Sequence, residues 1–403
     1  MSHTLIQIIS EETMPNLLAA MALNPERVVH LCTPAMEGAS AALERAYGQS
    51  WVKTTVITHN LSAHPGMIEL NDAVASVIGE MGDAVVNFTG GTKLMSIGAY
   101  AAATRAKVPS IYVDTAAGEF VDGLSGGDFK ALFPKSTAIS QVSRQLSVNG
   151  VATAYGVERV SSGKQWKGYV RLADFLLRNP VVEQQCHDVV ADILKKEPHD
   201  FQQSQAYYRD LYDRRLAIPD VVGELAALAG LLEKRADGFC PASKWYSKFK
   251  GFNLSHGNIP FKLLFGATEE ARLPFSFFNG NWWEIAVMHY LDAQGCYRDL
   301  RWSVDAGSRY GSSTDMEEDI LGIEDMNLLY VSCKRGGEKS RLSRVLEDVN
   351  SSARRLGGKF AHKMVAVFVD VSGMQKTRLV NRCKELHIEL LDRAAIASVP
   401  PVV

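Results

Sequence analysis

The sequence predicts an α/β protein in which two sheet-containing domains are joined by a mainly helical connector. Short apolar strands alternate with helices over the first 115 residues, and a second strand-rich region lies near the C-terminus. With 403 residues, the chain is long enough for two or three domains, each able to bury a core. We expect these domains at residues 1–135, 136–237 and 238–403.

The composition is typical of a globular protein. Apolar residues make up 46% and charged residues 22% of the chain, and the net charge is only −2, so nucleic-acid binding would depend on local basic patches. Six cysteines are scattered without C-x-x-C pairing, which argues against a disulfide framework and a zinc site. The sequence shows neither the pattern of a signal peptide nor a membrane-spanning apolar run. We therefore expect a cytoplasmic protein with no membrane partner.

Five predicted strands alternate with four predicted helices in the first domain. The strands are residues 4–9, 27–32, 53–58, 84–88 and 110–113, and the helices are residues 15–23, 39–46, 66–81 and 93–107. This alternation is typical of a parallel, doubly wound, Rossmann-like sheet, whose ligands bind beyond the carboxyl ends of the strands. Ser10 and Thr33 follow two of those ends.

The loop after the fourth strand reads NFTGGTK over residues 87–93. Two glycines followed by a helix that opens with Thr and Lys let backbone N–H groups approach phosphates closely. The spacing matches neither a P-loop nor a G-x-G-x-x-G fingerprint. A tight turn between strand and helix, capped by Thr92, explains the same residues. From the pattern alone, a phosphate-binding loop and a structural turn both remain open.

The predicted connector is mainly helical, with helices over residues 169–177, 181–195 and 221–235, and a small hairpin is expected just before it at residues 118–123. The apolar and charged residues of these helices are spaced as in helices that pack between larger domains. A winged-helix interpretation would make the region bind duplex nucleic acid. The helices lack an Arg- and Lys-rich recognition face, so we favour the packing interpretation.

A β-hairpin is predicted near the C-terminus, after a helix at residues 279–291. Two apolar runs, residues 319–323 and 328–334, flank a polar turn. Pairing them about that turn places Ile323 opposite Leu328 and Asp319 opposite Ser332. Strand alternation then puts Lys334 on the same face as Ser332. An acid and a lysine therefore converge at one end of the hairpin.

An acid and a lysine placed together can catalyse the attack of a water molecule on a phosphodiester. A carboxylate such as Asp319 can bind a hard divalent cation, a neighbouring backbone carbonyl can add a second ligand, and Lys334 can orient or deprotonate a water. Glu284 can complete the site from the preceding helix. An ordinary amphipathic hairpin with a solvated end would carry the same residues, so this alternative stays open.

These residues resemble the motif of the PD-(D/E)xK nuclease superfamily. Glu284 matches its first-helix acid, Asp319 its strand acid, and residues 332–334 (Ser-Cys-Lys) its E-x-K position. The resemblance implies a restriction-endonuclease-like domain that holds Mg²⁺ or Mn²⁺ through Glu284, Asp319 and the Cys333 carbonyl, with Ser332 and Lys334 in the catalytic site. The sequence departs at Ser332, where the family usually has an acid. Either the Cys333 carbonyl or Glu317 would have to compensate.

A doubly wound domain with N-x-T-G-G-T-K after its fourth strand also resembles the CRISPR-associated Rossmann fold (CARF) domain. Its pairing with a PD-(D/E)xK domain is similar to the ancillary nucleases of type III CRISPR systems. The resemblance implies a homodimer that binds a cyclic oligoadenylate, most often cyclic tetra-adenylate, and thereby activates cutting of DNA, RNA or both. It places the ligand against residues of the glycine-rich loop and of two strand ends. These residues are Thr89, Gly90, Gly91, Thr92 and Lys93 in the loop, and Ser10 and Thr33 at the strand ends.

Two further patterns bear on nucleic-acid binding. Aromatic residues are frequent over residues 245–278, where we expect most of them in the core, and only the interleaved lysines are candidates for substrate contact: Lys244, Lys248, Lys250 and Lys262. A basic helix is predicted over residues 340–356. We expect it to make the surface around the proposed metal site basic, although a solvated helix face would look the same. The basic residues are Arg341, Arg344, Arg354 and Arg355, together with Lys334, Arg335 and Lys339. The alternative function is a nucleotide-sensing binding protein whose nuclease-like domain is inactive, for which Ser332 is the main evidence.

Overall fold

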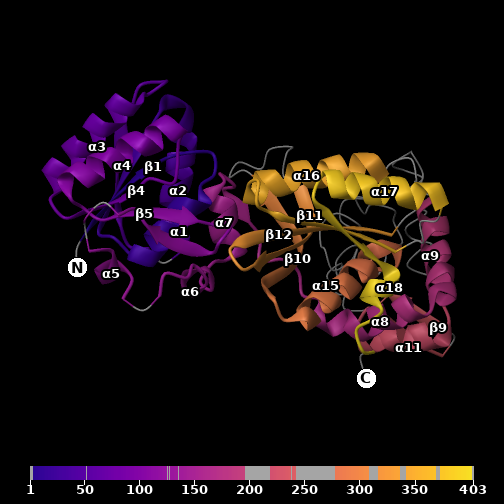
Figure 1. Ribbon diagram of the computed structural model, residues 1–403. Coiled ribbons are helices and arrows are strands. Elements are labelled where there is room, and N and C mark those ends of the chain that lie inside the picture. The colour runs from indigo at the N-terminus through magenta and orange to yellow at the C-terminus, as the bar shows by residue number, and fades with distance from the viewer. Residues whose placement is uncertain are drawn as a thin grey trace, which may run out of the picture.

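The computed structural model of the chain forms two lobes, with the N-terminus in one and the C-terminus in the other (Figure 1). It describes the following residues: 3–50, 52–124, 126, 128–134, 136–195, 218–236, 238–241, 277–307, 316–335, 342–368 and 373–401. The predicted substrate lysines at 244–262 and most of the aromatic residues beside them lie outside these ranges. Within them, no helix has the length and apolar character needed to cross a membrane.

Six described strands form the N-terminal sheet in the order β3-β2-β1-β4-β5-β6. Their bounds are β1 (Thr4–Ile8), β2 (Arg27–Cys32), β3 (Thr55–Asn60), β4 (Ala84–Asn87), β5 (Ser110–Asp114) and β6 (Glu119–Asp122). The first five pair in parallel, so the predicted doubly wound sheet is confirmed. The expected separate hairpin at residues 118–123 is wrong, because β6 pairs antiparallel with β5 and extends the main sheet.

Helices cover both faces of this sheet because its apolar residues alternate in direction. Leu5 and Val28 pack with one pair of helices, α1 (Met14–Leu23) and α2 (Glu37–Gln49). Ile6 and Val29 pack on the other face, against the pair α3 (Met67–Met81) and α4 (Lys93–Ala106). The central strands β1, β2 and β4 are therefore buried along almost their whole length, as expected for parallel strands covered on both faces, whereas the edge strand β3 is largely exposed.

The segment between the two sheets is helical but also supplies strands. Its described elements are α5 (Phe129–Leu132), α6 (Ser140–Ser143), α7 (Val148–Ala154), β7 (Arg159–Val160), η2 (Lys167–Tyr169), α8 (Val170–Arg178), α9 (Pro180–Lys195), α11 (Asp220–Leu228), β8 (Leu232–Arg235) and β9 (Gly238–Pro241). The predicted helix over residues 221–235 is wrong in its second half. Gly230 takes a positive φ of 73° and ends the helix, and β8 pairs with β9.

The C-terminal sheet has six described strands in the order β14-β13-β12-β11-β10-β7. They are β10 (Tyr297–Gly307), β11 (Met316–Glu324), β12 (Asn327–Lys334), β13 (His362–Val367) and β14 (Ile388–Asp392), with β7 at the edge. The predicted hairpin is confirmed, since Ile323 pairs with Leu328. Strand β10 was not expected from the sequence. Strands β12, β13 and β14 run parallel.

Helices lie on both faces of the C-terminal sheet (Figure 1). Helices α16 (Leu342–Gly357) and α17 (Gly373–Glu385) cover one face, and α15 (Trp282–Gln294) with α8 covers the other. A turn, η4 (Phe277–Asn281), precedes α15, and the short helix α18 (Arg393–Ile396) follows β14. Trp282 and Trp283 are buried, and the Trp283 indole N–H donates to the Ala366 carbonyl at 3.1 Å, so they fix the start of α15 against the sheet.

One hydrophobic cluster continues from the N-terminal domain into the C-terminal domain. It joins the α1 and α2 face of the first sheet to the α16 face of the second sheet. Helix α7, which lies between the lobes in Figure 1, contributes Val148 and Val151 to this cluster. It contacts both α2 and α16. Because the apolar contact is continuous, the two lobes are not independent bodies joined by a loose linker.

Candidate functional site

A cavity opens where the strand order of the N-terminal sheet reverses. Strands β2 and β3 lie on one side of β1, and β4 and β5 lie on the other. The connections after β1 and β4 therefore run to opposite faces of the sheet and leave a crevice beyond the carboxyl ends of these strands. Doubly wound sheets bind their ligands in such a crevice, and here it is formed by the segments that follow Ile8 and Asn87.

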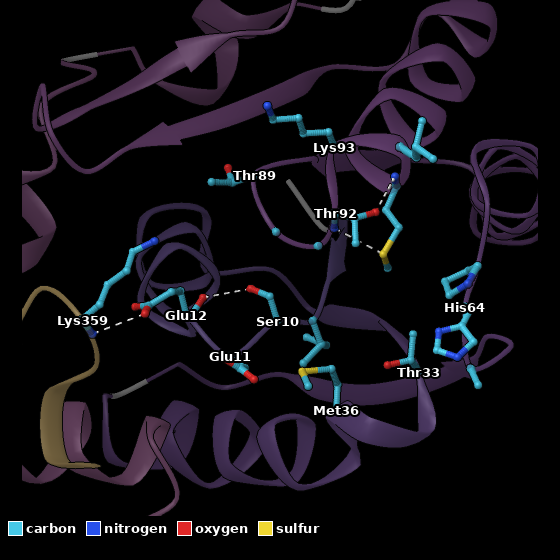
Figure 2. A pocket seen from close by; sticks show the side chains of 17 residues that line it. Ser10, Glu11, Glu12, Thr33, Met36, His64, Thr89, Thr92, Lys93 and Lys359 are labelled. Atoms are coloured by element: carbon cyan, nitrogen blue, oxygen red, sulfur yellow. Dashed lines mark hydrogen bonds between the residues drawn. The ribbon is translucent and has the colours of Figure 1, made fainter. Parts of the chain in front are cut away.

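The cavity has a volume of about 790 Å³, and all seven residues predicted to bind a ligand line it (Figure 2). Ser10 follows β1, Thr33 follows β2, and the glycine-rich loop follows β4. The volume is in the range of small-molecule sites. The complete lining is Ile9, Ser10, Glu11, Glu12, Thr33, Met36, Ala63, His64, Pro65, Thr89, Gly90, Gly91, Thr92, Lys93, Leu94, Met95 and Lys359.

The two glycines of the loop allow it to lie directly on the end of β1. A Cβ atom on Gly90 would stand 2.2 Å from the carbonyl oxygen of Ile8, which is far inside van der Waals contact. Gly91 has a φ of +80°, and a Cβ atom there would stand 2.7 Å from the Ile8 side chain. The glycines are therefore required by packing, whether or not a ligand is bound.

Helix α4 begins at the rim of this cavity. Thr92 is its N-cap, and its hydroxyl accepts a hydrogen bond from the Met95 N–H at 3.3 Å. The first N–H groups of a helix have no partner within the helix and carry its positive dipole end, so an anion is stabilised there. Lys93 adds an exposed ammonium group at the same place. The two interpretations of the loop are therefore compatible, since a capped turn also presents donors to an anion.

Thr89 has a structural task that the sequence pattern did not reveal. Its hydroxyl donates to the Asn87 side chain at 2.7 Å and accepts from the Val113 N–H at 2.7 Å. Asn87 is fully buried, and its amide donates to Asn16 at 3.3 Å. Asn16 in turn donates to the Ile8 carbonyl at 3.0 Å. This network pins the loop to α1, β1 and β5, and it occupies the Thr89 hydroxyl.

Ten of the seventeen cavity residues were not predicted, among them Glu12, Met36, His64 and Lys359. Glu12 and Met36 follow β1 and β2, as the predicted Ser10 and Thr33 do, and His64 follows β3, the next strand of the same sheet. A wider search of the loops after each strand would have found these three. Lys359 follows α16 in the C-terminal domain, and no local pattern connects it to this cavity.

The C-terminal domain places the predicted acids and the lysine together. Asp319 lies on β11, and its Oδ2 atom accepts three hydrogen bonds from β12. The donors are the Ser332 hydroxyl at 3.1 Å, the Cys333 backbone N–H at 2.6 Å and the Lys334 ammonium at 3.4 Å. The Asp319 side chain is 22% exposed and that of Lys334 is 38% exposed, so the pair is accessible from solvent.

Glu284 reaches the same place from the first turn of α15. Its Oε2 atom accepts a hydrogen bond from the Trp302 indole N–H at 2.6 Å. Burial, followed by the negative charge of Asp319, raises the pKa of Glu284 to about 8. The Lys334 charge opposes this rise but does not cancel it. Ionising Glu284 beside the Asp319 carboxylate is costly because the two negative charges repel each other. A cation bound between them would reduce this repulsion.

Glu317 is a further acid beside this group. Its charge acts on Glu284, its carboxylate is bound by Lys164 at 2.9 Å, and it accepts a hydrogen bond from the Ser303 hydroxyl. Lys164 comes from the segment before α8, so that segment contributes to the site. Glu317 is thus in place to supply the negative charge that Ser332 lacks. Trp302 and Ser303 lie on β10, the strand that was not expected from the sequence.

The donor set fits a hard cation that keeps part of its water shell. Among the described residues, no three His, Cys, Asp or Glu side chains are placed to hold a metal ion together. Mg²⁺ commonly needs only one or two protein carboxylates, because waters and substrate phosphates complete its octahedron. Glu284 and Asp319 meet this requirement. The Cys333 thiol is buried in the apolar core, and burial raises its pKa, so it remains a neutral packing group. Any ligand from Cys333 would be its carbonyl.

The predicted basic surface around the acids is smaller than expected. Arg335 forms a bidentate pair with Glu183 of α9, at 2.7 and 3.0 Å. Arg355 pairs with Glu318 at 2.9 Å. Both guanidinium groups are therefore engaged within the protein, whereas Arg344 and Arg354 of α16 are exposed. Arg341 and Lys339, which were part of the same prediction, lie outside the described residues.

Fold and sites together define a protein in which a Rossmann-like domain with a cavity at its strand-order reversal is joined to a second α/β domain with an acid and lysine cluster. The family model "Card1 CARF domain" matches residues 4–131, so the N-terminal domain is a CARF domain. This match confirms the predicted resemblance of the first domain to CARF domains, and solved structures share the fold of the chain. No curated protein matches the chain.

Three solved structures illustrate that shared fold. Can2 from Sulfobacillus thermosulfidooxidans, in complex with cyclic tetra-adenylate, aligns with 98% of this chain and 97% of its own, at 18% identity and a TM-score of 0.68. Protein VC1899 from Vibrio cholerae aligns with 98% of this chain and 95% of its own, at 14% identity and a TM-score of 0.69. A type III CRISPR defence DNA nuclease activated by cyclic oligoadenylate aligns with 92% of this chain and 46% of its own, at 16% identity and a TM-score of 0.54.

Proposed function

We propose that this protein is a nuclease of type III CRISPR defence that a cyclic oligoadenylate activates, with cyclic tetra-adenylate as the ligand. The observation that carries the proposal is the cavity at the reversal of the CARF sheet, which is lined by the glycine-rich loop and the start of α4. Backbone donors, a helix N-terminus and Lys93 suit the phosphates of a cyclic oligonucleotide. Can2, which shares the fold over nearly the whole chain, was solved with cyclic tetra-adenylate.

The proposed active form is a cytoplasmic homodimer. A cyclic tetranucleotide has two-fold symmetry, so two copies of the same cavity can bind equivalent halves of it across an isologous interface. Large apolar side chains are exposed beside the cavity at the starts of α3 and α4, with exposed fractions of 44–73% for Met67, Ile68, Leu94 and Ile97. An exposed apolar group of this kind is typical of a protein interface.

Roles in the C-terminal site follow from its contacts. Glu284 and Asp319 are placed to hold Mg²⁺ or Mn²⁺, and a bound cation would stabilise the charge that develops on a phosphodiester. Lys334 is held beside Asp319 at 3.4 Å, where its ammonium group can orient an attacking water and neutralise the phosphate. Ser332 donates to the same carboxylate and keeps it turned toward the lysine. The expected reaction is cleavage of single-stranded DNA or RNA, or nicking of double-stranded nucleic acid.

A second candidate function is a ligand-sensing protein whose C-terminal domain no longer cuts. The observation that favours it is Ser332, which occupies the position of the usual acid. To separate the two functions, we would incubate the protein and Mn²⁺ with labelled single-stranded DNA, single-stranded RNA and supercoiled plasmid, each with and without cyclic tetra-adenylate. Cutting that needs the ligand supports the nuclease. Ligand binding without cutting supports the sensor, and the absence of both contradicts the proposed function.

Metal binding is expected to strengthen with pH up to about 8. Glu284 must lose its proton to bind a cation, and its pKa in the metal-free protein is raised to about 8. Below that pH, each unit should weaken the apparent Mn²⁺ affinity by up to about tenfold, because binding must release the proton. Isothermal titration from about pH 6 to about pH 9 measures this. Glu284→Gln should abolish the pH dependence, and an affinity that is flat below pH 8 in the wild type would contradict the role of Glu284.

A further inference from the structure

Lys359 is the one cavity residue among those described that belongs to the C-terminal domain. Every other described lining residue lies between residues 9 and 95. Lys359 lies in the short connection between α16 and β13, and in Figure 2 it stands beside Glu12 at the edge of the cavity. Its side chain is exposed, with the ammonium group 4.7 Å from the centre of the Phe360 ring. The C-terminal domain thus presents a cation to a cavity that the N-terminal domain builds.

Glu12 ties this connection to the N-terminal domain. One carboxylate oxygen accepts the Lys359 backbone N–H at 3.3 Å, and the other accepts the Tyr155 hydroxyl at 3.1 Å. Burial, together with the Glu12 charge, raises the pKa of Tyr155, so the hydroxyl keeps the proton that it donates. Gly358 has a φ of +70°, and a Cβ atom there would stand 2.3 Å from the Tyr155 hydroxyl. The connection therefore lies tightly against both domains.

A short path leads from Lys359 to the acids of the C-terminal site. Four residues earlier on the same helix end, Arg355 donates to Glu318 at 2.9 Å. Glu318 is only 2% exposed, and it also accepts the Tyr330 hydroxyl at 2.7 Å. It precedes Asp319 directly in β11. A shift of the α16 end is therefore carried by a buried, charge-assisted hydrogen bond to the residue next to the proposed cation ligand.

We infer that Lys359 binds a phosphate group of the cyclic oligoadenylate and thereby couples an occupied cavity to the position of α16 and Asp319. The inference rests on the proposed function and adds how the bound ligand would regulate the C-terminal site. Without ligand, the connection is held by the Glu12 carboxylate. A phosphate group brought beside Glu12 repels that carboxylate and attracts the Lys359 ammonium, so the ligand-bound state favours a different position of the connection. A ligand can shift such an equilibrium only through contacts that differ between the two states, and this pair supplies them.

The test compares four full-length proteins: the wild type, Lys359→Ala, Lys359→Arg and Lys384→Ala. Lys384 is the matched control, an exposed lysine on α17 of the same domain and outside the cavity lining. Titration calorimetry with cyclic tetra-adenylate gives Kd, and cutting with Mn²⁺ at saturating ligand gives the maximal rate. We expect Lys359→Ala to raise Kd by about tenfold and to lower the maximal rate by at least about threefold. Lys359→Arg should restore most of the ligand affinity and most of the maximal rate. Lys384→Ala should match the wild type in both quantities.

The outcomes separate this inference from the proposed function. A wild type that neither binds the ligand nor cuts contradicts the proposed function. A wild type that does both, with Lys359→Ala equal to it, overturns the role of Lys359. Weaker binding by Lys359→Ala with a full maximal rate at saturation overturns the coupling and leaves Lys359 as a ligand contact only. Loss of maximal rate at saturation, restored by Lys359→Arg, supports the coupling.

Discussion

Replacing Lys334 by alanine is expected to lower the ligand-dependent cutting rate by about 10²–10⁴-fold, the range for removing a positioned general acid or base. The side chain is more than one-third exposed, and its ammonium group contacts Asp319 at 3.4 Å. Its removal should therefore leave the fold and the ligand affinity unchanged. Cutting of a labelled strand under single-turnover conditions, with Mn²⁺ and saturating cyclic tetra-adenylate, measures the effect.

The matched control for this variant is Lys376→Ala, which removes an exposed lysine from α17 of the same domain. It should cut at the wild-type rate. Asp319→Asn provides the complementary test, because it keeps the shape of the side chain while removing the charge that would hold a cation and Lys334. If Lys334→Ala cuts as fast as the wild type while Asp319→Asn does not, the lysine has no part in the chemistry.

The second large effect is expected at Gly90 in the ligand-binding domain. Alanine there would place its Cβ atom 2.2 Å from the Ile8 carbonyl oxygen, so either the loop or the end of β1 must move. We expect a loss of about 3 kcal/mol in the free energy of unfolding and a thermal midpoint lower by about 10 °C. Because the same loop lines the cavity, binding of cyclic tetra-adenylate should also be lost.

Gly79 is the control for this substitution. It lies within α3, exposed, with nothing within 4 Å of the position that a Cβ atom would take. Alanine at that site should stabilise the protein by about 0.5–1 kcal/mol, since it lowers the conformational entropy of the unfolded chain. Differential scanning fluorimetry compares the two variants. A Gly90→Ala protein as stable as the wild type would show that the loop is not held against β1.

Several parts of the fold were predictable because they depend on local periodicity. The five parallel strands of the first sheet were each predicted as a short run, and their alternation with helices predicted that they pair in parallel, whereas their order in the sheet came from the structure. The hairpin register was also predictable, since pairing about the turn between Glu324 and Asn327 sets every later pair. Strand β10 escaped prediction because its pattern is interrupted. Ser303 takes a φ of 54° within it, and the neighbouring Trp302 and Val304 face different hydrophobic clusters.

In the candidate sites too, the sequence named some of the residues, but only the structure showed what surrounds them. Glu284, Asp319 and Lys334 were named from spacing and a family resemblance, and the structure brings them together. Burial and Asp319 raise the pKa of Glu284, and the hydrogen bond from Trp302, on the strand that local periodicity did not reveal, opposes that rise. The pKa of a buried acid depends on what surrounds it in three dimensions. Sequence spacing could name the acid but not its ionisation.

The sequence by itself determined the strand ends that line the cavity, because the carboxyl ends of parallel strands must meet at one edge of a sheet. It also determined that Gly90 and Gly91 stand at one of those ends. Only the tertiary structure decided that Lys359, more than 260 residues later, would line the same cavity and that Glu12 would hold its backbone. That contact depends on how α7 and one continuous apolar cluster join the two domains, and such long-range packing leaves no local periodic pattern.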